Sequence, residues 1–403
     1  YVALLTAVFG TLAAYGSALI TARSSLGAVW KRIIDGIALV TNTIPGMVLG
    51  LAFLFCFSIL DALWPKREFS ELENRKLMQP PKLTLAGVLS KDDPWMAKYT
   101  EYTKDQFIFR DGWIDLKSRA EAMLLKTENN GIWFGKDNYL FPKFLAVGER
   151  FEKNLDAVER MAQRHPGKVS VMIAPSSSLV LSEKLPWQAP VADEDIYHDS
   201  IVERLSGQAA VYDLRKTLRA HGDEYIFYRT DHHWTSEGAY LAYEQFAGSK
   251  GLPLFDRSAA NEKKVENFYG TSYSKARNYD VVPDTITYYD LPNQLTVYTA
   301  NADGSESGET GPLYNTADFE TRDKYKAFLR GNNGYSVLEG NGTGSILIIK
   351  DSYANAFIPY LVEDYASIGI VDFRYLNKKV DSSIDIYVED VACFEAKLGH
   401  TKL

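Results

Sequence analysis

The feature that most constrains the fold is an alternation of short apolar runs with segments of helical spacing. KVSVMIAPSSSLV contains a largely apolar run at 169–174 that predicts a buried strand, and SILIIK (345–350) is interpreted as an uninterrupted apolar strand. SEGAYLAYEQFAGSKG (236–251) and NAFIPYLVEDY (355–365) have the spacing of helices. Strands that alternate with helices favour an α/β domain with a mostly parallel sheet.

Other segments extend this pattern. AAVYDLR (209–215), EYIFYR (224–229) and SIGIVDFRYL (367–376) are strand-like, and GIWFGKDNYLF (131–141) predicts two short strands around a turn. Residues 92–126 and 144–165 predict helices. Residues 256–344 interrupt the alternation, because they are rich in Tyr, Asn, Gly and Thr. We expect this stretch to be an insertion of loops and short strands.

The N-terminal region differs in composition from the rest of the chain. Residues 1–22 and 37–60 contain no charged side chain, and each run is long enough to be a transmembrane helix. The intervening residues 23–32 carry three basic residues and no acid, which places them in the cytoplasm and everything from residue 65 outside. Lys66 and Arg67 act against this orientation. We therefore expect a protein of the cell membrane whose main domain is extracytoplasmic.

These runs divide the chain into a membrane segment (1–63), a Pro- and charge-rich linker (64–90) and an α/β domain (91–403). Residues 1–60 resemble the permease subunit of an ABC importer, on the run TIPGMVLGLAF. Nothing after them matches the coupling loop of such permeases, so we expect these helices to serve as an anchor. The chain begins at Tyr1 rather than methionine, which predicts that it is part of a longer protein.

Composition excludes several function classes. The net charge is −8 and no dense Lys/Arg block is present, which argues against a nucleic-acid partner. The two cysteines, Cys56 and Cys393, can form neither a disulfide framework nor a CxxC metal pair. No phosphate-cradling loop occurs, so we expect neither a metal nor another cofactor.

Chemistry is concentrated in TDHHWTSEGAY (230–240), which holds two of the six histidines. In an extended segment Asp231 and His233 share a face, while His232 points away. A carboxylate beside an imidazole fixes its tautomer and stabilises the imidazolium, as a general base requires. The alternative is that His233 is a core histidine and Asp231 a turn residue.

Such a base needs a nucleophile, which IIKDSYANAFIPYL provides. Ser352 stands in a polar turn between an apolar strand and a helix, where free backbone N–H groups stabilise a developing oxyanion. Serine is a weak nucleophile unless a base lies within hydrogen-bond reach, so we expect Ser352 to contact His233. The alternative role for Ser352 is to cap its helix.

The stretches FSELENR, TDHHWTSEGAY, FYGTSYSKA and IIKDSYANAFIPYL resemble the DHHW family of bacterial surface proteins over residues 64–403. That family is similar to the alginate O-acetyltransferase group, whose domain has an SGNH-hydrolase-like α/β fold. The resemblance implies that Asp231 is the orienting acid, His233 the base and Ser352 the nucleophile. Lys350 departs from the pattern, since SGNH hydrolases usually carry glycine before Asp-Ser.

The resemblance further implies a basic or tyrosine side chain that assists the oxyanion, and Arg374 and Tyr353 are the matching residues. Asn355, in the same turn as Ser352, is a further candidate for oxyanion or substrate binding. Trp234 could stack on a sugar ring or pack in the core.

Our first hypothesis is a membrane-anchored, extracytoplasmic serine O-acyltransferase that modifies a cell-surface polysaccharide. The resemblance implies that the group transferred is acetyl and that a membrane-bound O-acyltransferase supplies it, with membrane lipid as a further contact. The alternatives are a carbohydrate esterase, and a non-catalytic polysaccharide-binding protein that retains the fold.

Overall fold

The computed structural model describes residues 27–30, 32–33, 46–70, 73, 75–90, 94–144, 147–148, 150–278, 280–300, 306–376 and 390–395. They belong to two compact units, formed by residues 1–69 with 76–110 and by 70–75 with 111–403. The first of the predicted membrane helices and most of the permease-like segment lie outside the described residues.

The second predicted membrane helix overlaps α3 (Gly46–Leu63). Among the helices that the structure describes, none combines the length and hydropathy needed to cross a bilayer.

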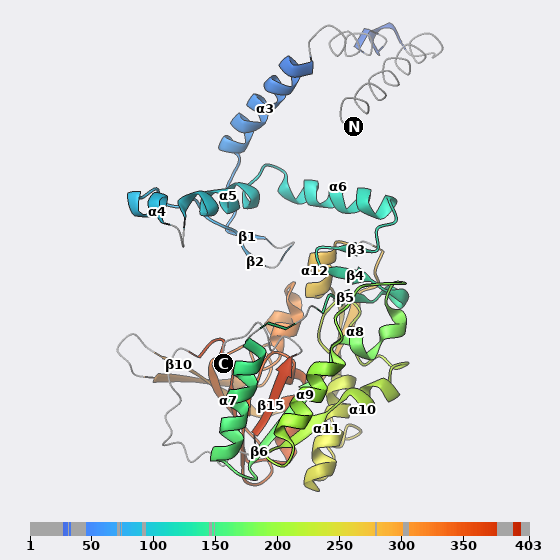
Figure 1. The fold of residues 1–403 in the computed structure, drawn as a ribbon, viewed down its shortest axis with the longest axis vertical. Helices are drawn as coiled ribbons and strands as arrows, with labels where there is room; N and C mark the ends of the chain where they lie inside the picture. The colour runs from blue at the N-terminus through green and yellow to red at the C-terminus, as the bar shows by residue number, and fades with distance from the viewer. Residues whose placement is uncertain are drawn as a thin grey trace. The chain divides into compact units, whose positions relative to one another are not determined.

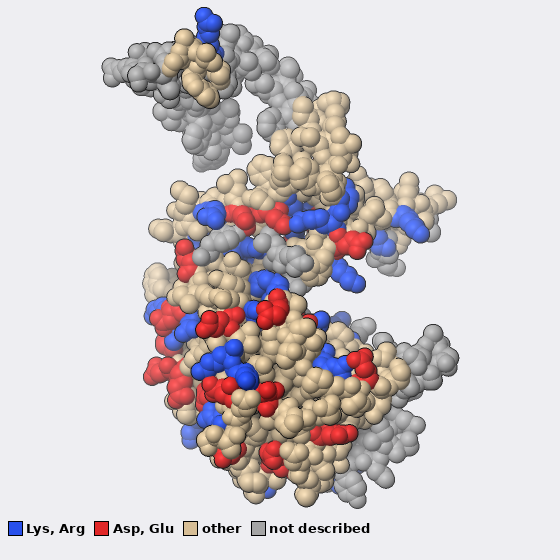
Figure 2. All heavy atoms as spheres, turned by 180° about the vertical axis from the view of Figure 1, so that it is seen from behind, with Lys and Arg blue, Asp and Glu red and all other residues tan. Residues whose placement is uncertain are grey.

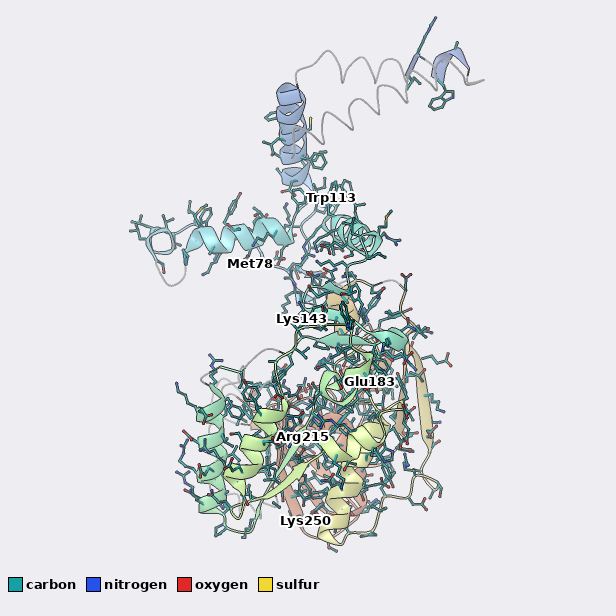
Figure 3. The ribbon with its side chains drawn as sticks, turned by 45° about the vertical axis from the view of Figure 1, so that its right-hand side comes forward. Met78, Trp113, Lys143, Glu183, Arg215 and Lys250 are labelled. Carbon is teal, nitrogen blue, oxygen red and sulfur yellow. The ribbon has the colours of Figure 1, made fainter. Side chains whose placement is uncertain are left out.

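In the first unit, residues 76–90 of the region predicted as a linker are hydrogen-bonded to the end of α5 (Trp95–Asp105). This region, residues 64–90, contains α4 (Leu85–Leu89), and α5 follows it. Gln106 at the end of α5 donates from its side-chain amide to the carbonyl of Met78 at 3.0 Å. Met78 is labelled in Figure 3.

The chain from α6 onward contains the α/β fold, with helices alternating with strands (Figure 1). The α-helices are α6 (Arg110–Met123), α7 (Arg150–Arg164), α8 (Ser177–Val180), α9 (Asp195–Leu205), α10 (Arg215–Ala220), α11 (Ser236–Lys250), α12 (Thr271–Ala276) and α13 (Ala354–Phe357). The strands are β3 (Glu128–Asn129), β4 (Ile132–Phe134), β5 (Leu140–Pro142), β6 (Val169–Ala174), β7 (Ala210–Asp213), β8 (Glu262–Phe268), β9 (Asp284–Tyr289), β10 (Gln294–Ala300), β11 (Glu306–Pro312), β12 (Tyr335–Glu339), β13 (Ser345–Ile349), β14 (Ser367–Val371) and β15 (Asp390–Glu395).

The single helix predicted for 92–126 is wrong, because the chain forms α5 and α6 with a break between them. Phe109 in this break has a φ of 53°, in the left-handed region that a continuous α-helix does not contain.

One sheet is parallel throughout, with the strand order β15–β6–β7. Every residue of β6 is buried, because both faces of the strand are covered. Val171 and Ile173 pack with α7 and α9 on one face, while Met172 and Ala174 point to the opposite face and join the main core. The buried strand predicted from VSVMIA is confirmed.

The larger sheet has the order β11–β10–β12–β14–β13, and among its pairs only β13–β14 is parallel. The prediction of a mostly parallel sheet is therefore wrong, since the larger sheet is mostly antiparallel and the parallel pairs are limited to β13–β14 and the small β15–β6–β7 sheet among the described strands. The connections explain the difference. β10 and β11 are close in sequence and pair antiparallel, whereas the helical segment between β13 and β14 allows a parallel crossover.

The main hydrophobic core holds α11 and α13 against each other. Phe246 of α11 contacts Phe357 of α13, with ring centroids 6.0 Å apart, and both are fully buried. Ile346 and Ile348 of β13 belong to the same cluster. Because this contact holds α11 against α13, the segments preceding the two helices are brought to the same side of the core.

Charged side chains on the face seen in Figure 2 are mixed, with Lys and Arg interspersed among Asp and Glu. Arg215, labelled in Figure 3, is an example of such pairing. Its guanidinium contacts Asp213 at 2.6 Å and Asp195 at 2.8 Å, which ties the end of β7 to the start of α9.

A buried histidine in the same region predicts a pH-dependent stability. Burial would lower the pKa of His198, but Asp213 and Glu194 outweigh it, so the pKa is raised. The stabilisation by protonated His198 is thus fully present below the ordinary pKa of histidine and is lost as pH rises through the folded-state value. We expect His198→Gln to lower the stability by about 1–3 kcal/mol in mild acid, the range for a charge-assisted hydrogen bond.

The measurement is the melting temperature of both chains between pH 5 and 9. The difference between them should shrink as the pH rises, and a difference that grows with pH would contradict the assignment.

Candidate active site

Residues 224–229, predicted as a strand, lead instead into a tight loop. Phe227 forms an isolated antiparallel bridge with Trp234. The N–H of Tyr228 donates to the carbonyl of His233 at 3.2 Å. The strand prediction is wrong because the segment has isolated pairings instead of a strand ladder: the Phe227–Trp234 bridge, and a hydrogen bond from the N–H of Leu140 in β5 to the carbonyl of Arg229 at 2.8 Å.

This loop brings together the three residues to which the sequence assigned chemistry. His233 Nδ1 lies 2.5 Å from Asp231 Oδ1, and His233 Nε2 lies 2.8 Å from Ser352 Oγ. The three residues are 5%, 2% and 8% exposed, respectively, in the order His233, Asp231 and Ser352. The geometry is that of a hydroxyl, an imidazole and a carboxylate linked by two hydrogen bonds.

Asp231 is held in its ionised form by the groups around it. Burial alone would raise the pKa of the carboxyl, but the imidazoles of His232 and His233 and hydrogen bonds from His233 and Thr271 hold it well below its ordinary value. Thr271 donates twice to Oδ2, from its N–H at 2.7 Å and from its hydroxyl at 2.9 Å. An ionised Asp231 accepts the Nδ1 proton of His233, so that Nε2 is left free to take a proton.

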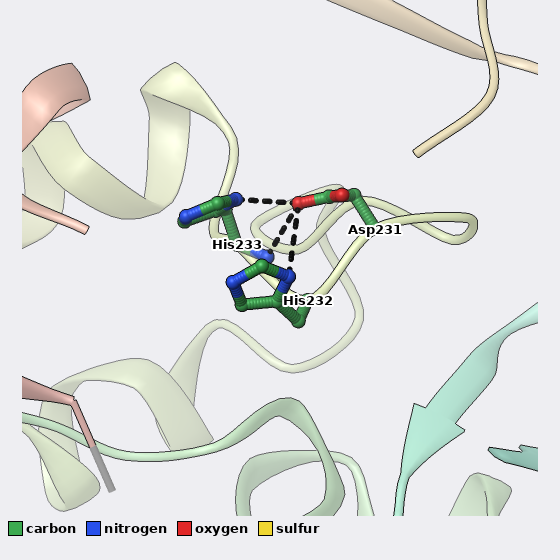
Figure 4. Close-up of side chains that lie close together, drawn as sticks. All are labelled: Asp231, His232 and His233. Carbon is green, nitrogen blue, oxygen red and sulfur yellow. Dashed lines mark hydrogen bonds and ion pairs between the residues drawn. The ribbon is translucent and has the colours of Figure 1, made fainter. Parts of the chain in front are cut away.

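His232 does not point away from this pair, as an extended segment would require. Its ring lies against that of His233, with centroids 3.9 Å apart, and its Nδ1 is 3.6 Å from Asp231 Oδ1 (Figure 4). The alternation expected of a strand fails because the chain bends here. His232 is fixed by a 2.7 Å contact between Nδ1 and the hydroxyl of Thr271.

The ligand atoms of Asp231, His232 and His233 lie within 4.8 Å of one another, which is close enough to reach a single metal ion. However, both ring nitrogens of His233 are already engaged, one with Asp231 and the other with Ser352. An ion bound through His233 would have to break one of these contacts. The hydrogen-bonded arrangement therefore fits acid–base chemistry better than metal binding.

Ser352 lies in the turn between β13 and α13. The N–H of Tyr353 is occupied, since it donates to Asp351 Oδ1 at 2.9 Å. The N–H of Ser352 itself has no acceptor within the described part of the chain. It is consequently a backbone donor that is available for an oxyanion.

Lys350 occupies the position that departs from the SGNH pattern, and its ammonium is fully buried. It donates to Asn355 Oδ1 at 2.6 Å and to Asn332 Oδ1 at 3.2 Å, and it lies 3.5 Å from Asp372 Oδ2. Burial lowers the pKa of Lys350 to about 8. This polar group ties the turn before Ser352 to the helix after it.

Comparison with known proteins identifies the family. A profile described as DHHW protein matches residues 152–371, more than half of the chain. The chain belongs to the DHHW family. The four letters of the family name stand at Asp231–Trp234, in the loop that provides the acid and the imidazole.

The first two of the following solved structures have a similar fold. A DHHW family protein from Eubacterium siraeum matches with a TM-score of 0.57 and 23% identity, covering 68% of this chain and 94% of that one. Bacillus cereus PatB1, solved with a sulfonyl adduct, matches with a TM-score of 0.53 and 18% identity, covering 68% and 98%. The O-acetyltransferase domain of Pseudomonas putida AlgJ matches with a TM-score of 0.41 and 16% identity, covering 68% and 94%. None of the curated proteins matches the chain.

The structure decides between the two roles left open for Trp234, and it gives Tyr353 a structural contact instead of the expected one. Trp234 is fully buried and its indole N–H donates to the Tyr353 carbonyl at 2.9 Å, so it packs in the core and offers no face to a sugar. The hydroxyl of Tyr353 donates to the carbonyl of His232, which directs it away from an oxyanion at Ser352.

The remaining two candidates are also engaged. Arg374 binds Asp372 through two hydrogen bonds, at 2.8 and 2.6 Å. The side chain of Asn355 binds Lys350 and Asn332, at 2.6 and 3.2 Å. Both residues therefore stabilise the turn that carries Ser352, and neither is directed by these contacts at the serine hydroxyl.

Sequence reasoning missed Tyr325, which touches both halves of the site. Its ring is stacked on the imidazole of His233, with centroids 4.0 Å apart and an interplanar angle of 12°. Its hydroxyl donates to the carbonyl of Ser352 at 3.1 Å. No local pattern around Tyr325 could reveal this, because both contacts are with distant segments.

Two further supports were missed, Asp284 and Gly270. Asp284 accepts the backbone N–H of Arg229 and of Thr230, at 2.9 and 2.7 Å, and so fixes the strand-like entry to the DHHW loop. Gly270 packs directly on Asp231. The block FYGTSYSKA, which the resemblance marked, contains Gly270 but gave no hint of its partner.

Gly270→Ala should damage the site. An added Cβ would lie 2.2 Å from the Cβ of Asp231, so the carboxylate would have to move. We expect a loss of about 1–3 kcal/mol in stability, as for overpacking, and about 10²-fold in kcat for ester hydrolysis, as for a small displacement of a reacting group. Gly248→Ala in α11 is the control, because a Cβ there meets nothing within 4 Å. Equal activity of the two variants would contradict the packing.

Tyr325 is expected to act as a positioning residue. Tyr325→Phe keeps the stack on His233 and loses the hydrogen bond to Ser352, whereas Tyr325→Leu loses both. We expect about a tenfold fall in kcat for the Phe variant, the value of one hydrogen bond, and a larger fall for the Leu variant. KM should change little in both. A rise in KM with an unchanged kcat would show that Tyr325 contacts the substrate instead.

Proposed function

We propose that this DHHW protein is a serine O-acyltransferase, with acetyl as the acyl group and a cell-surface polysaccharide as the acceptor. The observation that carries the proposal is the pair of contacts made by His233, 2.5 Å to Asp231 and 2.8 Å to Ser352. The similarity of the DHHW family to the alginate O-acetyltransferase group supports the choice of acyl group and acceptor.

The reaction would proceed in two halves. Ser352 Oγ forms a bond to the acyl carbonyl carbon as its proton passes to His233 Nε2, and the carbonyl oxygen becomes an oxyanion near the N–H of Ser352. The donor's leaving group then departs with the proton from His233, which leaves an ester on Ser352. Asp231 stabilises the imidazolium in each proton-bearing state.

In the second half, a sugar hydroxyl replaces the leaving group. His233 Nε2 takes the proton of the sugar hydroxyl as its oxygen attacks the serine ester, and Ser352 recovers a proton when the acyl group leaves. If water attacks instead, the same residues make the protein a carbohydrate esterase. Transfer and hydrolysis thus differ in which nucleophile reaches the ester.

The test of this proposal has two readouts. PatB1, which has the same fold, was solved with a sulfonyl adduct, so a sulfonyl fluoride is a suitable probe. We expect it to modify the chain stoichiometrically at Ser352, as read by peptide mass spectrometry. Incubation with p-nitrophenyl acetate and an oligosaccharide should then give acetylated sugar. Hydrolysis without any sugar product would favour the esterase, and no labelling at all would favour a non-catalytic binding protein.

We further propose that the α/β domain lies outside the cytoplasm and is anchored by the apolar runs at 1–22 and 37–60. The basic residues between the runs support this orientation. The test is digestion of intact spheroplasts by an added protease. Loss of the α/β domain is the expected result, and full protection would overturn the orientation.

A further inference from the structure

Two arginines near the DHHW loop stand out because the described residues give neither of them a salt bridge. Arg277 is 3% exposed, and its Nε and Nη2 atoms are buried without any hydrogen-bond acceptor. Arg322 is half-buried and donates from Nη2 to the hydroxyl of Ser274 at 2.8 Å. Within the described residues neither guanidinium takes part in an ion pair.

Both arginines lie at α12: Arg277 is the C-terminal cap of this helix, and Arg322 packs over Tyr273 within it. The backbone N–H of Arg277 donates to the carbonyl of Tyr273 at 3.0 Å, while the guanidinium of Arg322 lies 5.4 Å from the ring of Tyr273. Burial lowers the pKa of Arg322, and the nearby charge of Arg277 lowers it further. Two like charges thus belong to residues beside the same short helix, and a negative group bound there would be stabilised by both.

Both arginines are connected to the catalytic acid through α12. This helix begins at Thr271, which donates twice to Asp231, and the hydroxyl of Ser274 binds the carbonyl of Gly270 at 3.2 Å. The charge of Asp231 also acts on Arg322. Asp231 itself is not available to neutralise the arginines, because it accepts hydrogen bonds from His233 and Thr271.

Buried polar groups in proteins are almost always paired, and an unpaired buried charge is strongly unfavourable. Guanidinium groups bind carboxylates and phosphates by parallel hydrogen bonds. We propose that Arg277 and Arg322 bind an oxyanion carried by the acceptor glycan, a carboxylate or a phosphate, beside the Ser352–His233–Asp231 site. Arg322 is the accessible member of the pair and Arg277 the buried one. This inference rests on the proposed function, since it specifies the class of the acceptor.

The test uses the Ser352→Ala chain, in which bound glycan cannot be turned over. Binding of an oligogalacturonate is compared by calorimetry with binding of the same oligomer after methyl esterification, which removes the charge and keeps the sugar. We expect the ester to bind at least about tenfold more weakly, as for the loss of a charge-assisted hydrogen bond. Equal binding of the two oligomers would overturn the proposal.

Variants then locate the effect. Arg322→Gln on the same background should bind the charged oligomer as weakly as the ester. Arg219→Gln is the matched control, because it removes an equal charge from an exposed pair with Asp195. If the control weakens binding as much as Arg322→Gln, net charge accounts for the effect and the proposal fails.

A third variant guards against misfolding. Arg277→Met removes the buried unpaired charge, so we expect a higher melting temperature together with loss of the upward shift that inorganic phosphate causes in the parent chain. A phosphate-induced shift that persists in Arg277→Met would overturn the site. Competition by phosphate against oligogalacturonate shows which oxyanion is preferred, and either order supports the site.

The proposed function is tested separately, by sulfonyl fluoride labelling of the chain with Ser352 intact. Labelling without a preference for charged glycan leaves the catalytic proposal standing and removes the anion site. A preference for charged glycan without labelling leaves the anion site standing and removes the catalytic proposal.

Discussion

Ser352→Ala is expected to abolish both sulfonyl labelling and ester hydrolysis. The hydroxyl is the atom 2.8 Å from His233 Nε2, and alanine leaves no group there that can form an acyl-enzyme. For serine enzymes with a triad, removal of the nucleophile lowers kcat by about 10⁶-fold, with the residual rate arising from the rest of the site. The measurement is kcat for p-nitrophenyl acetate together with the mass of the labelled chain.

The control for this variant is Ser258→Ala, which removes an exposed serine hydroxyl whose partner is Asp256. It should label and turn over like the parent chain. Turnover by Ser352→Ala at the rate of this control would show that another residue is the nucleophile and would remove the proposed mechanism.

Asp231→Asn should have the second largest effect, a fall in kcat of about 10³–10⁴-fold, as found where a triad aspartate is replaced by its amide. The amide cannot stabilise an imidazolium, and its NH₂ group favours the tautomer of His233 that carries its proton on Nε2. That tautomer cannot accept the proton of Ser352. The variant is isosteric, so we expect labelling by sulfonyl fluoride to slow without loss of the fold.

The same variant affects stability in a defined direction. Because the folded pKa of Asp231 is depressed, its stabilisation is present above the ordinary pKa of aspartate and is lost as pH falls through the folded value. The difference in melting temperature between parent and Asp231→Asn should therefore be large at neutral pH and shrink in acid. Asp256→Asn, at an exposed site, is the control. A variant with parental kcat would show that Asp231 only shapes the loop.

The elements that the sequence predicted correctly are those specified by local pattern. β6 and β13 are mainly apolar runs of strand length, and α11 has helical spacing, a threonine N-cap and Gly251 at its C-terminus. The nearness of Ser352 and His233 could also be anticipated, because both precede helices that follow strand-like segments. Their chemistry gave a reason for them to meet.

Other features depend on contacts between distant segments, which one sequence does not display. The direction of strands in the larger sheet depends on which strands become neighbours. β10 pairs with β12, although β11 lies between them in the sequence. The roles of Tyr325 and Gly270 have the same origin. His232 was misplaced because the rule for extended chains was applied to residues that bend.

The hydroxyl and imidazole that meet in this site are 119 residues apart along the chain. Closing a loop of that length costs conformational entropy before the contact adds any stabilisation. Such long-range pairings are therefore slow to form and come late in folding. A partly folded molecule with the DHHW loop in place would still lack an activated serine. A fluorescent sulfonyl reagent would accordingly label only fully folded molecules and leave nascent or damaged chains unlabelled. It could therefore follow the maturation of this protein in living cells.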